Sequence, residues 1–136
     1  MEEQNYKFPL QEKEKWMGFL KDHGYAVVQE VISKEEVQQA KDLFWEWLEA
    51  LGSGIDRKDP ETWVDANWPG SGSVGFFVSY GGCHTKASWF LRTRPNVKET
   101  FKTIWNTPEL ITSFDTFICW RPWWNEASNK AWDPYV

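Results

Sequence analysis

Two stretches in the first half of the chain have the apolar spacing of amphipathic helices. The first runs from Gln11 to Asp22, and Gly24 just beyond it is a typical helix stop. Its apolar positions are Trp16, Met17, Phe19 and Leu20. The second begins at Ser33 and ends at Gly52, and Ser33 and Glu36 fit a capping box, in which each side chain accepts a hydrogen bond from a backbone N–H of the first turn. Its apolar stripe, which we expect in the core, is Val37, Ala40, Phe44, Trp47, Leu48 and Leu51.

The segments around these helices have other patterns. Residues 1–9 predict a loose lead-in. Tyr25–Ile32 is an apolar run, too short for a helix and rich in β-branched residues, and therefore predicts a strand. Residues 52–75 are loop-like, but Trp63 and Trp68 within them indicate a packed loop rather than a flexible linker.

Short elements follow in the second half. Gly75–Tyr80 predicts a short strand, and Thr85–Arg92 predicts a helical turn. Pro95 suits the first position of a further helix. The predicted buried side of that helix is Val97, Phe101, Ile104 and Trp105. Thr107–Ile111 predicts one more short turn.

The most strand-like run of the second half is Ser113–Trp124, and the chain is organised around it. Alternation places Phe114, Thr116, Ile118 and Trp120 on one face, which we expect to be the core face. Asp115, Phe117, Cys119 and Arg121 share the other face, where a carboxylate, a thiol and a guanidinium suit the wall of a pocket. An ordinary half-buried strand is the alternative interpretation, and pairing weakens at Pro122, which has no N–H to donate.

Composition narrows the class of protein. At 136 residues the chain is one domain or part of one. Its eleven tryptophans are unusual, and each indole N–H needs a hydrogen-bond partner when the ring is buried. So many indoles suggest either a domain rich in pockets or surfaces that further polypeptide covers.

The charge and composition of the sequence argue against several kinds of partner and cellular location. The net charge is −5 and no basic run exceeds two residues, so we expect no nucleic acid partner. No apolar run approaches the ~20 residues of a membrane span, so no membrane partner is expected. The acidic N-terminus lacks a signal or transit pattern, and two cysteines with no indicated pairing suit a reducing compartment. The prediction is a cytoplasmic protein.

Motifs for chemistry are scarce. Residues 70–75 match G-x-G-x-x-G, but a strand follows them instead of the helix that a dinucleotide site requires. The histidines, His23 and His84, begin no H-x-D or H-x-E pair, and Cys83 has no second Cys/His cluster with which to hold zinc. We therefore predict no catalytic residue and no metal ligand in these 136 residues.

The order of segments nevertheless resembles a known family. G-Y-A-V-V-Q-E-V-I-S is followed by K-E-E-V-Q-Q-A-K-D-L-F-W-E-W-L, then by G-G-C-H-T-K-A-S-W-F-L-R, P-N-V-K-E-T-F and S-F-D-T-F-I-C-W-R-P-W-W. This order is similar to the N-terminal portion of the phytanoyl-CoA dioxygenase-like Fe(II)/2-oxoglutarate oxygenases. The resemblance covers nearly all of this chain but only about the front half of such a domain.

The resemblance implies a fold and a chemistry. The fold is α+β, with N-terminal helices and the first strands of a double-stranded β-helix of the jelly-roll or cupin type, here an incomplete barrel in a single partial domain, 1–136. The family hydroxylates a small organic or acyl substrate with Fe(II) and 2-oxoglutarate, held by an H-x-D pair, a distal His and a basic residue. None of these ligands is present, so the expectation is a truncated form, inactive alone, whose metal ligands lie beyond Val136.

The resemblance also assigns supporting roles. His84, Trp89, Trp120 and Arg121 are the candidates for lining the pocket, and Arg92 and Asp115 are candidates for structural support. Two other functions stay open. One is a non-catalytic domain whose tryptophans stack on carbohydrate, and the other is a regulatory form that associates with itself or a longer partner through uncovered core surface.

Overall fold

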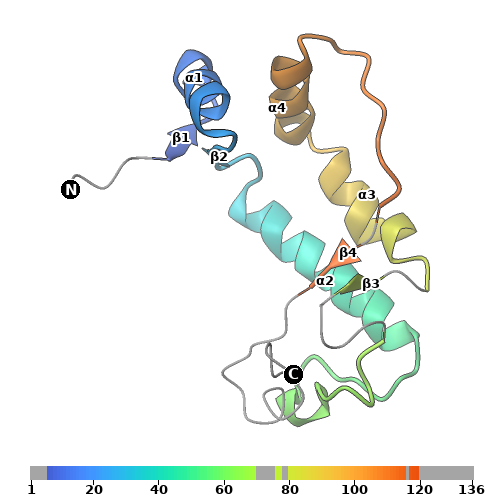
Figure 1. Ribbon diagram of the computed structural model, residues 1–136. Helices are drawn as coiled ribbons and strands as arrows, with labels where there is room; N and C mark the ends of the chain where they lie inside the picture. Colours follow the sequence, from blue (N-terminus) through green and yellow to red (C-terminus); the bar gives the residue numbers. More distant parts are fainter. Residues whose placement is uncertain (1–5, 70–75, 78–79, 116, 120–136) are drawn as a thin grey trace, which may run out of the picture. The chain divides into compact units, whose positions relative to one another are not determined.

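Helices and a few short strands make up most of the described chain (Figure 1). The computed structural model describes residues 6–69, 76–77, 80–115 and 117–119. In chain order the elements are β1 (Lys7–Pro9), α1 (Lys13–His23), β2 (Val27–Gln29), α2 (Lys34–Ala50), η1 (Pro60–Thr62), β3 (Phe76–Phe77), η2 (Gly82–His84), α3 (Lys86–Arg92), α4 (Pro95–Trp105) and β4 (Phe117–Ile118). They fall into a first unit, residues 1–37 and 91–112, and a second unit, residues 38–90 and 113–136. This part is α+β; the double-stranded β-helix and the single partial domain stay predictions.

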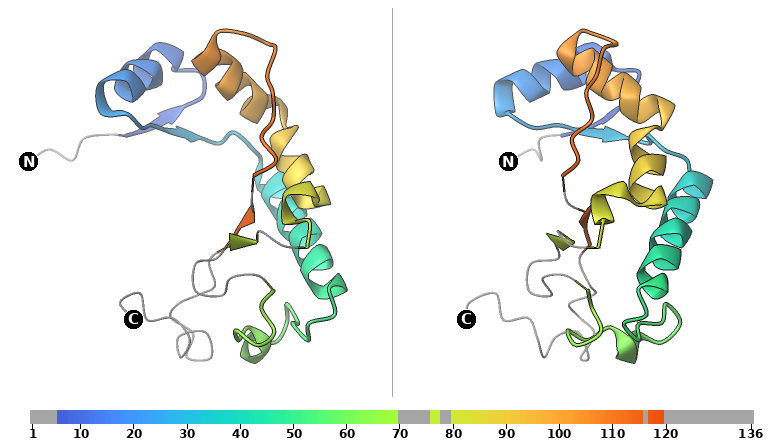
Figure 2. Two further views of the ribbon diagram at one scale, coloured as in Figure 1. Left: turned by 45° about the vertical axis from the view of Figure 1, so that its right-hand side comes forward. Right: turned by 90° about the vertical axis from the view of Figure 1, so that its right-hand side faces the viewer.

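The first unit contains a β–α–β arrangement. β1 and β2 pair in parallel, with Phe8 opposite Val28, and α1 connects them (Figure 2). The indole of Trp16 on α1 is fully buried and donates to the carbonyl of Leu10 at 3.2 Å. The rings of Phe8 and Phe19 lie 5.3 Å apart, which joins β1 to α1. This helix was predicted at nearly these bounds, with Trp16 on its buried side.

The strands of the first unit differ from the prediction in two places. Residues 7–9 form β1 where a loose lead-in was expected, because their backbone finds its partner in β2. The predicted strand Tyr25–Ile32 is reduced to Val27–Gln29. Glu30 follows in the left-handed region, at φ 54°, which bends the chain out of strand geometry. The predicted helix stop at Gly24 is confirmed. Gly24 is left-handed, at φ 79°, and its N–H donates to the carbonyl of Leu20 in the last turn of α1.

The start of α2 is held by the predicted capping box. The N–H of Ser33 donates to the carboxylate of Glu36 at 2.9 Å, and the N–H of Glu36 donates to the Ser33 hydroxyl at 3.2 Å. The other oxygen of Glu36 accepts from the Arg94 guanidinium at 3.3 Å. One carboxylate therefore caps a helix and also ties it to a residue 58 positions later in the chain.

The apolar side of α4 does not lie in a core. The sequence predicted Val97, Phe101, Ile104 and Trp105 as its buried side, but none of them is buried. Phe101 is 50% exposed and Trp105 is 68% exposed. The helical period was correct, but a period only states which side chains share a face. It does not state what, if anything, covers that face.

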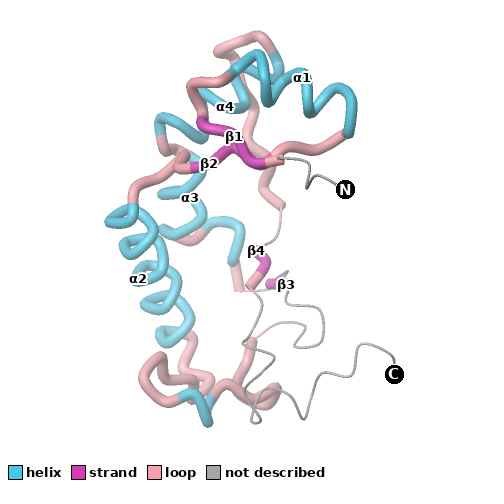
Figure 3. Tube along the Cα trace, turned by 90° about the vertical axis from the view of Figure 1, so that its left-hand side faces the viewer, coloured by secondary structure: helices cyan, strands magenta, loops and turns pink. Residues whose placement is uncertain are grey.

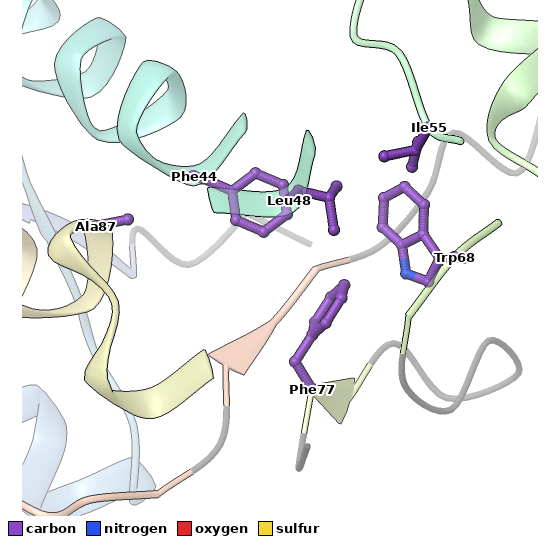
Figure 4. Close-up of a cluster of buried hydrophobic side chains, with 6 residues drawn as sticks. All are labelled: Phe44, Leu48, Ile55, Trp68, Phe77 and Ala87. Carbon is purple, nitrogen blue, oxygen red and sulfur yellow. The ribbon is translucent and has the colours of Figure 1, made fainter. Parts of the chain in front are cut away.

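The second unit has its core on the remainder of α2. Ala40, Phe44 and Leu48 are buried along the predicted stripe. Figure 4 shows Phe44 and Leu48 from α2 converging with residues of three other segments. The complete cluster is Phe44, Leu48, Ile55, Trp68, Phe77 and Ala87. Within it the Phe44 and Phe77 rings meet edge to face with centroids 6.1 Å apart, and the Trp68 ring is tilted against Phe77 at 5.7 Å.

The loop after α2 is packed, as its tryptophans predicted. Ile55 and Trp68 enter the core cluster, and Trp63 lies against it. The indole of Trp63 stacks 5.1 Å from Trp45 and donates to the carbonyl of Asp56 at 2.8 Å. The Trp63 indole therefore packs against the core cluster with its N–H group satisfied.

Arg57 ties this loop back to α2. Its guanidinium contacts both oxygens of the Glu49 carboxylate, with Nε donating to Oε1 at 3.1 Å and Nη2 donating to Oε2 at 2.9 Å. This contact lowers the pKa of Glu49, chiefly because the carboxylate accepts those hydrogen bonds. The loop therefore leaves the end of α2 in a defined direction.

The second unit also contains the short antiparallel pair β3–β4, in which Phe76 lies opposite Ile118 (Figure 3). The predicted strand Ser113–Trp124 was too long at its start, because residues 113–115 are not in a strand. Its expected core face was also wrong: Phe114 is 61% exposed and Ile118 is 49% exposed. Instead Cys119, expected in a pocket wall, packs against the core cluster. Alternation cannot run from Phe114 to Ile118 when the strand begins at Phe117.

Within the described ranges, none of the helices has the length and apolar content that a membrane span requires.

Replacing Leu48 with alanine tests the core of the second unit. Leu48 is fully buried, so Leu48→Ala should lower the free energy of unfolding by about 2–5 kcal/mol through lost burial and a cavity. Val37→Ala on the same helix is the control, because Val37 is 41% exposed. Its effect should stay within about 0.5 kcal/mol. Urea denaturation followed by circular dichroism measures both, and equal losses would contradict this description of the core.

Ser33→Ala tests the capping box. It removes the hydroxyl that accepts from the Glu36 N–H and should cost about 1 kcal/mol of unfolding free energy. Lys34→Ala is the matched control, because Lys34 lies in the same turn, is exposed and takes no part in the box. A loss at Lys34 as large as that at Ser33 would mean that the hydroxyl contributes nothing specific.

Candidate functional site

A tight turn positions the candidate residues that precede α3. Tyr80 and Gly81 are both left-handed, at φ 59° and 68°. Glycine adopts this region at little cost, but a tyrosine there is uncommon, so the chain holds Tyr80 against its own preference. The turn leads directly into η2, which ends at His84.

A buried hydroxyl network fixes the start of α3. The Thr85 hydroxyl accepts from the Ser88 N–H at 3.1 Å, as an N-terminal cap does. The Ser88 hydroxyl in turn donates to the carbonyl of Gly82 at 2.8 Å. Both side chains are buried, and their hydroxyl oxygens lie 3.0 Å apart. Because these bonds join η2 to α3, His84 and Trp89 project from one connected piece of backbone.

His84 and Trp89 meet at Phe114. The Phe114 ring lies 5.0 Å from the His84 imidazole and 5.9 Å from the Trp89 indole, measured between ring centroids. We call these three side chains the aromatic cluster. Trp89 is 38% exposed and Phe114 is 61% exposed, so the cluster has an open surface. It can stack on a flat or apolar group, while the imidazole can exchange a hydrogen bond with it.

The structure brings together two of the residues that the sequence predicted to line a pocket. His84 and Trp89 come together, but through Phe114, which the sequence had assigned to the core face. The sequence named Phe114 only through the alternation of the predicted strand, which placed it on the core face. The other two predicted pocket residues, Trp120 and Arg121, lie outside the described residues.

The two supporting residues occupy different positions. Arg92 is half-buried in the last turn of α3, and Asp115 is exposed immediately after Phe114. Both take part in interactions within the protein. Their structural roles stay predictions.

Metal-binding side chains are dispersed in the part of the chain that the structure describes. No three His, Cys, Asp or Glu side chains there converge closely enough to hold an ion. His84 stacks on Phe114, and the His23 ring lies 4.2 Å from Phe19 in the first unit. The described residues therefore do not fit the iron site that the family resemblance implies, and no step through iron or 2-oxoglutarate is derived from them.

Cys119 is a structural thiol. It packs against the core cluster, and burial raises its pKa to about 11. Desolvation disfavours the thiolate, which is the form that attacks and binds metals. This residue is therefore unsuited to nucleophilic chemistry near neutral pH.

Part of a curated fungal protein is similar to this chain. "Ava biosynthesis cluster protein O" from Aspergillus versicolor is 32% identical over 117 residues, which cover 79% of this chain and 38% of that protein. The chain thus spans well under half the length of the curated relative that it matches. No family model matches the chain, and no solved structure matches it.

The half-buried position of Cys119 makes a prediction for cysteine labelling. In the Cys83→Ser variant, Cys119 should react slowly with a disulfide reagent at pH 8, because only about 0.1% of a thiol with a pKa of about 11 is then ionised. The labelling rate of the folded variant should keep rising as the pH is increased toward 11. The same variant unfolded in urea is the control, and its rate should level off near the ordinary thiol pKa. A folded-state profile identical to the unfolded one would show that Cys119 is not buried.

Proposed function

We propose that this chain is the N-terminal part of a phytanoyl-CoA dioxygenase-like oxygenase that acts on a small organic or acyl substrate, and that it holds neither Fe(II) nor 2-oxoglutarate by itself. The observation that carries the proposal is the similarity to a biosynthesis cluster protein of which this chain covers only 38%. A chain that corresponds to part of a longer relative agrees with the segment order that resembles the front of an oxygenase domain. The relative is named for a biosynthesis cluster, and a small molecule is the substrate class that we propose on that basis.

The described geometry is compatible with a supporting role. The aromatic cluster offers an open apolar surface with one imidazole, and it is held on η2 and α3 by buried hydrogen bonds. Such a surface suits the substrate side of a pocket, where apolar area binds and a few polar groups orient. The metal donors would come from polypeptide beyond the described residues, as the sequence predicts. The jelly-roll fold and the cytoplasmic location are parts of the same proposal.

Stacking on carbohydrate is a weaker second candidate, because most described tryptophans already serve in packing. Trp16 and Trp68 are buried, and Trp45, Trp47 and Trp63 lie against the core cluster. Among the described residues this leaves Trp89 and Trp105 as the exposed indoles. The exposed Trp89 beside Phe114 is the feature that favours this candidate. Fluorescence titration with a glycan panel tests it, and a saturable response lost in Trp89→Ala would favour it over the oxygenase.

Metal and co-substrate titration tests the first proposal. Calorimetry of the 136-residue chain under anaerobic conditions should show no stoichiometric binding of Fe(II), and none of 2-oxoglutarate with Fe(II) present. The reason is that no three His, Cys, Asp or Glu side chains converge among the described residues, so each histidine there gives at most a weak, single-ligand contact. His84→Ala serves as a control, because it should abolish any residual binding at the exposed imidazole. One-to-one Fe(II) binding by the unaltered chain would contradict the proposal.

The transcript tests the family assignment separately. Sequence beyond codon 136 should encode an H-x-D pair followed by a distal His, and the longer product should release succinate from 2-oxoglutarate. If no reading frame beyond that codon supplies the pair, the oxygenase proposal fails even where the titrations show no binding.

A further inference from the structure

A shallow hollow lies on the first unit, beside α4. Its volume is about 360 Å³, near the lower end of the roughly 300–1,000 Å³ typical of small-molecule sites. Pro95 at the start of α4 lines one part of it, and Pro108 and Leu110 from the segment after α4 line another. These residues form a rigid apolar wall, since two of the three are prolines.

The remainder of the lining is polar, with Thr93 and three charged side chains. Lys98 and Lys102, one helical turn apart on α4, line the same hollow with Glu99. The Glu99 carboxylate is already occupied, because Lys13 donates to it at 2.6 Å and Lys102 at 3.3 Å. The hydrogen bonds from Lys13 and then Lys102 lower the pKa of Glu99, so it stays ionised and bound to them at neutral pH.

Lys98 is the cation in this hollow without a counter-ion. In the ranges that the structure describes, its ammonium makes no hydrogen bond or ion pair, whereas Lys102 contacts Glu99. Glu99 is paired with Lys13 and Lys102, and Lys98 lines the hollow in addition, so the lysines at and beside this hollow outnumber its one carboxylate. The N-terminal turn of α4 adds positive potential at the Pro95 end.

We propose that this hollow binds a small monocarboxylate with a short alkyl chain. The carboxylate pairs with the ammonium of Lys98, and the alkyl chain lies against Pro95, Pro108 and Leu110. Phosphate is a poorer fit, because one unpaired ammonium supplies few donors for three or four oxygens and the rest of the wall is apolar. The site is partly open, so the ion pair is screened and the affinity is modest. This inference does not rest on the proposed function, since no residue of the aromatic cluster takes part.

A titration with hexanoate, followed by two-dimensional ¹H–¹⁵N NMR of the full chain, tests the site. Saturable shifts should gather at residues 93–99 and 108–110, with a dissociation constant on the order of millimolar. Lys98→Gln should weaken binding about fivefold, and Lys98→Arg should largely restore it. Lys41→Gln, which removes an exposed lysine of α2, should leave the constant unchanged. Leu110→Ala should weaken hexanoate but not acetate.

Three outcomes would overturn the proposal. The first is the absence of saturable shifts at these residues with hexanoate. The second is Lys98→Gln binding as tightly as the unaltered chain, or 1-hexanol binding as tightly as hexanoate, because either would remove the role of the charge. The third is inorganic phosphate binding there as tightly as hexanoate, because that would remove the role of the apolar wall.

Discussion

The packing of Phe44 and Leu48 against residues from the following loop and strand is the contact on which the second unit depends. Both residues come from the apolar stripe of α2, and Ile55, Trp68 and Phe77 close over them. The strands here are too short to support themselves, since β3 and β4 pair over two residues each. Side-chain burial, rather than the hydrogen-bond ladder, therefore holds β3 and the loop after α2 in place.

This constraint explains the high tryptophan content better than a ligand does. A small unit with short strands needs much buried area from few residues, and an indole supplies more than any other side chain. Two of the packed indoles also donate their N–H groups within the protein: Trp16 donates to the carbonyl of Leu10, and Trp63 donates to the carbonyl of Asp56. Among the described residues, tryptophan therefore serves chiefly in packing, and only Trp89 and Trp105 are exposed there.

Local signals in the sequence predicted the local structure well. The Ser33–Glu36 capping box, the stop at Gly24 and the packed loop all rest on interactions between residues close in the chain, and all are confirmed. The failures concern what lies across from a segment. Periodicity identified the apolar side of α4 but could not state that it is uncovered, and alternation misassigned Phe114 because the strand begins only at Phe117. Contacts between distant positions, such as Arg94 with Glu36, leave no pattern in a single sequence.

The same limit applied to the candidate site. His84 and Trp89 were singled out by resemblance, but their meeting point, Phe114, comes from a segment 25 positions after Trp89 and could not be inferred from spacing. An aromatic side chain that is 61% exposed loses most of the burial that normally justifies its cost in a folded domain. Phe114 is not exposed singly, because it lies beside the exposed Trp89, and the two rings form one apolar surface. In the proposed oxygenase, which like the relative would be much longer than this chain, further polypeptide and a bound substrate would both cover the exposed face of Phe114.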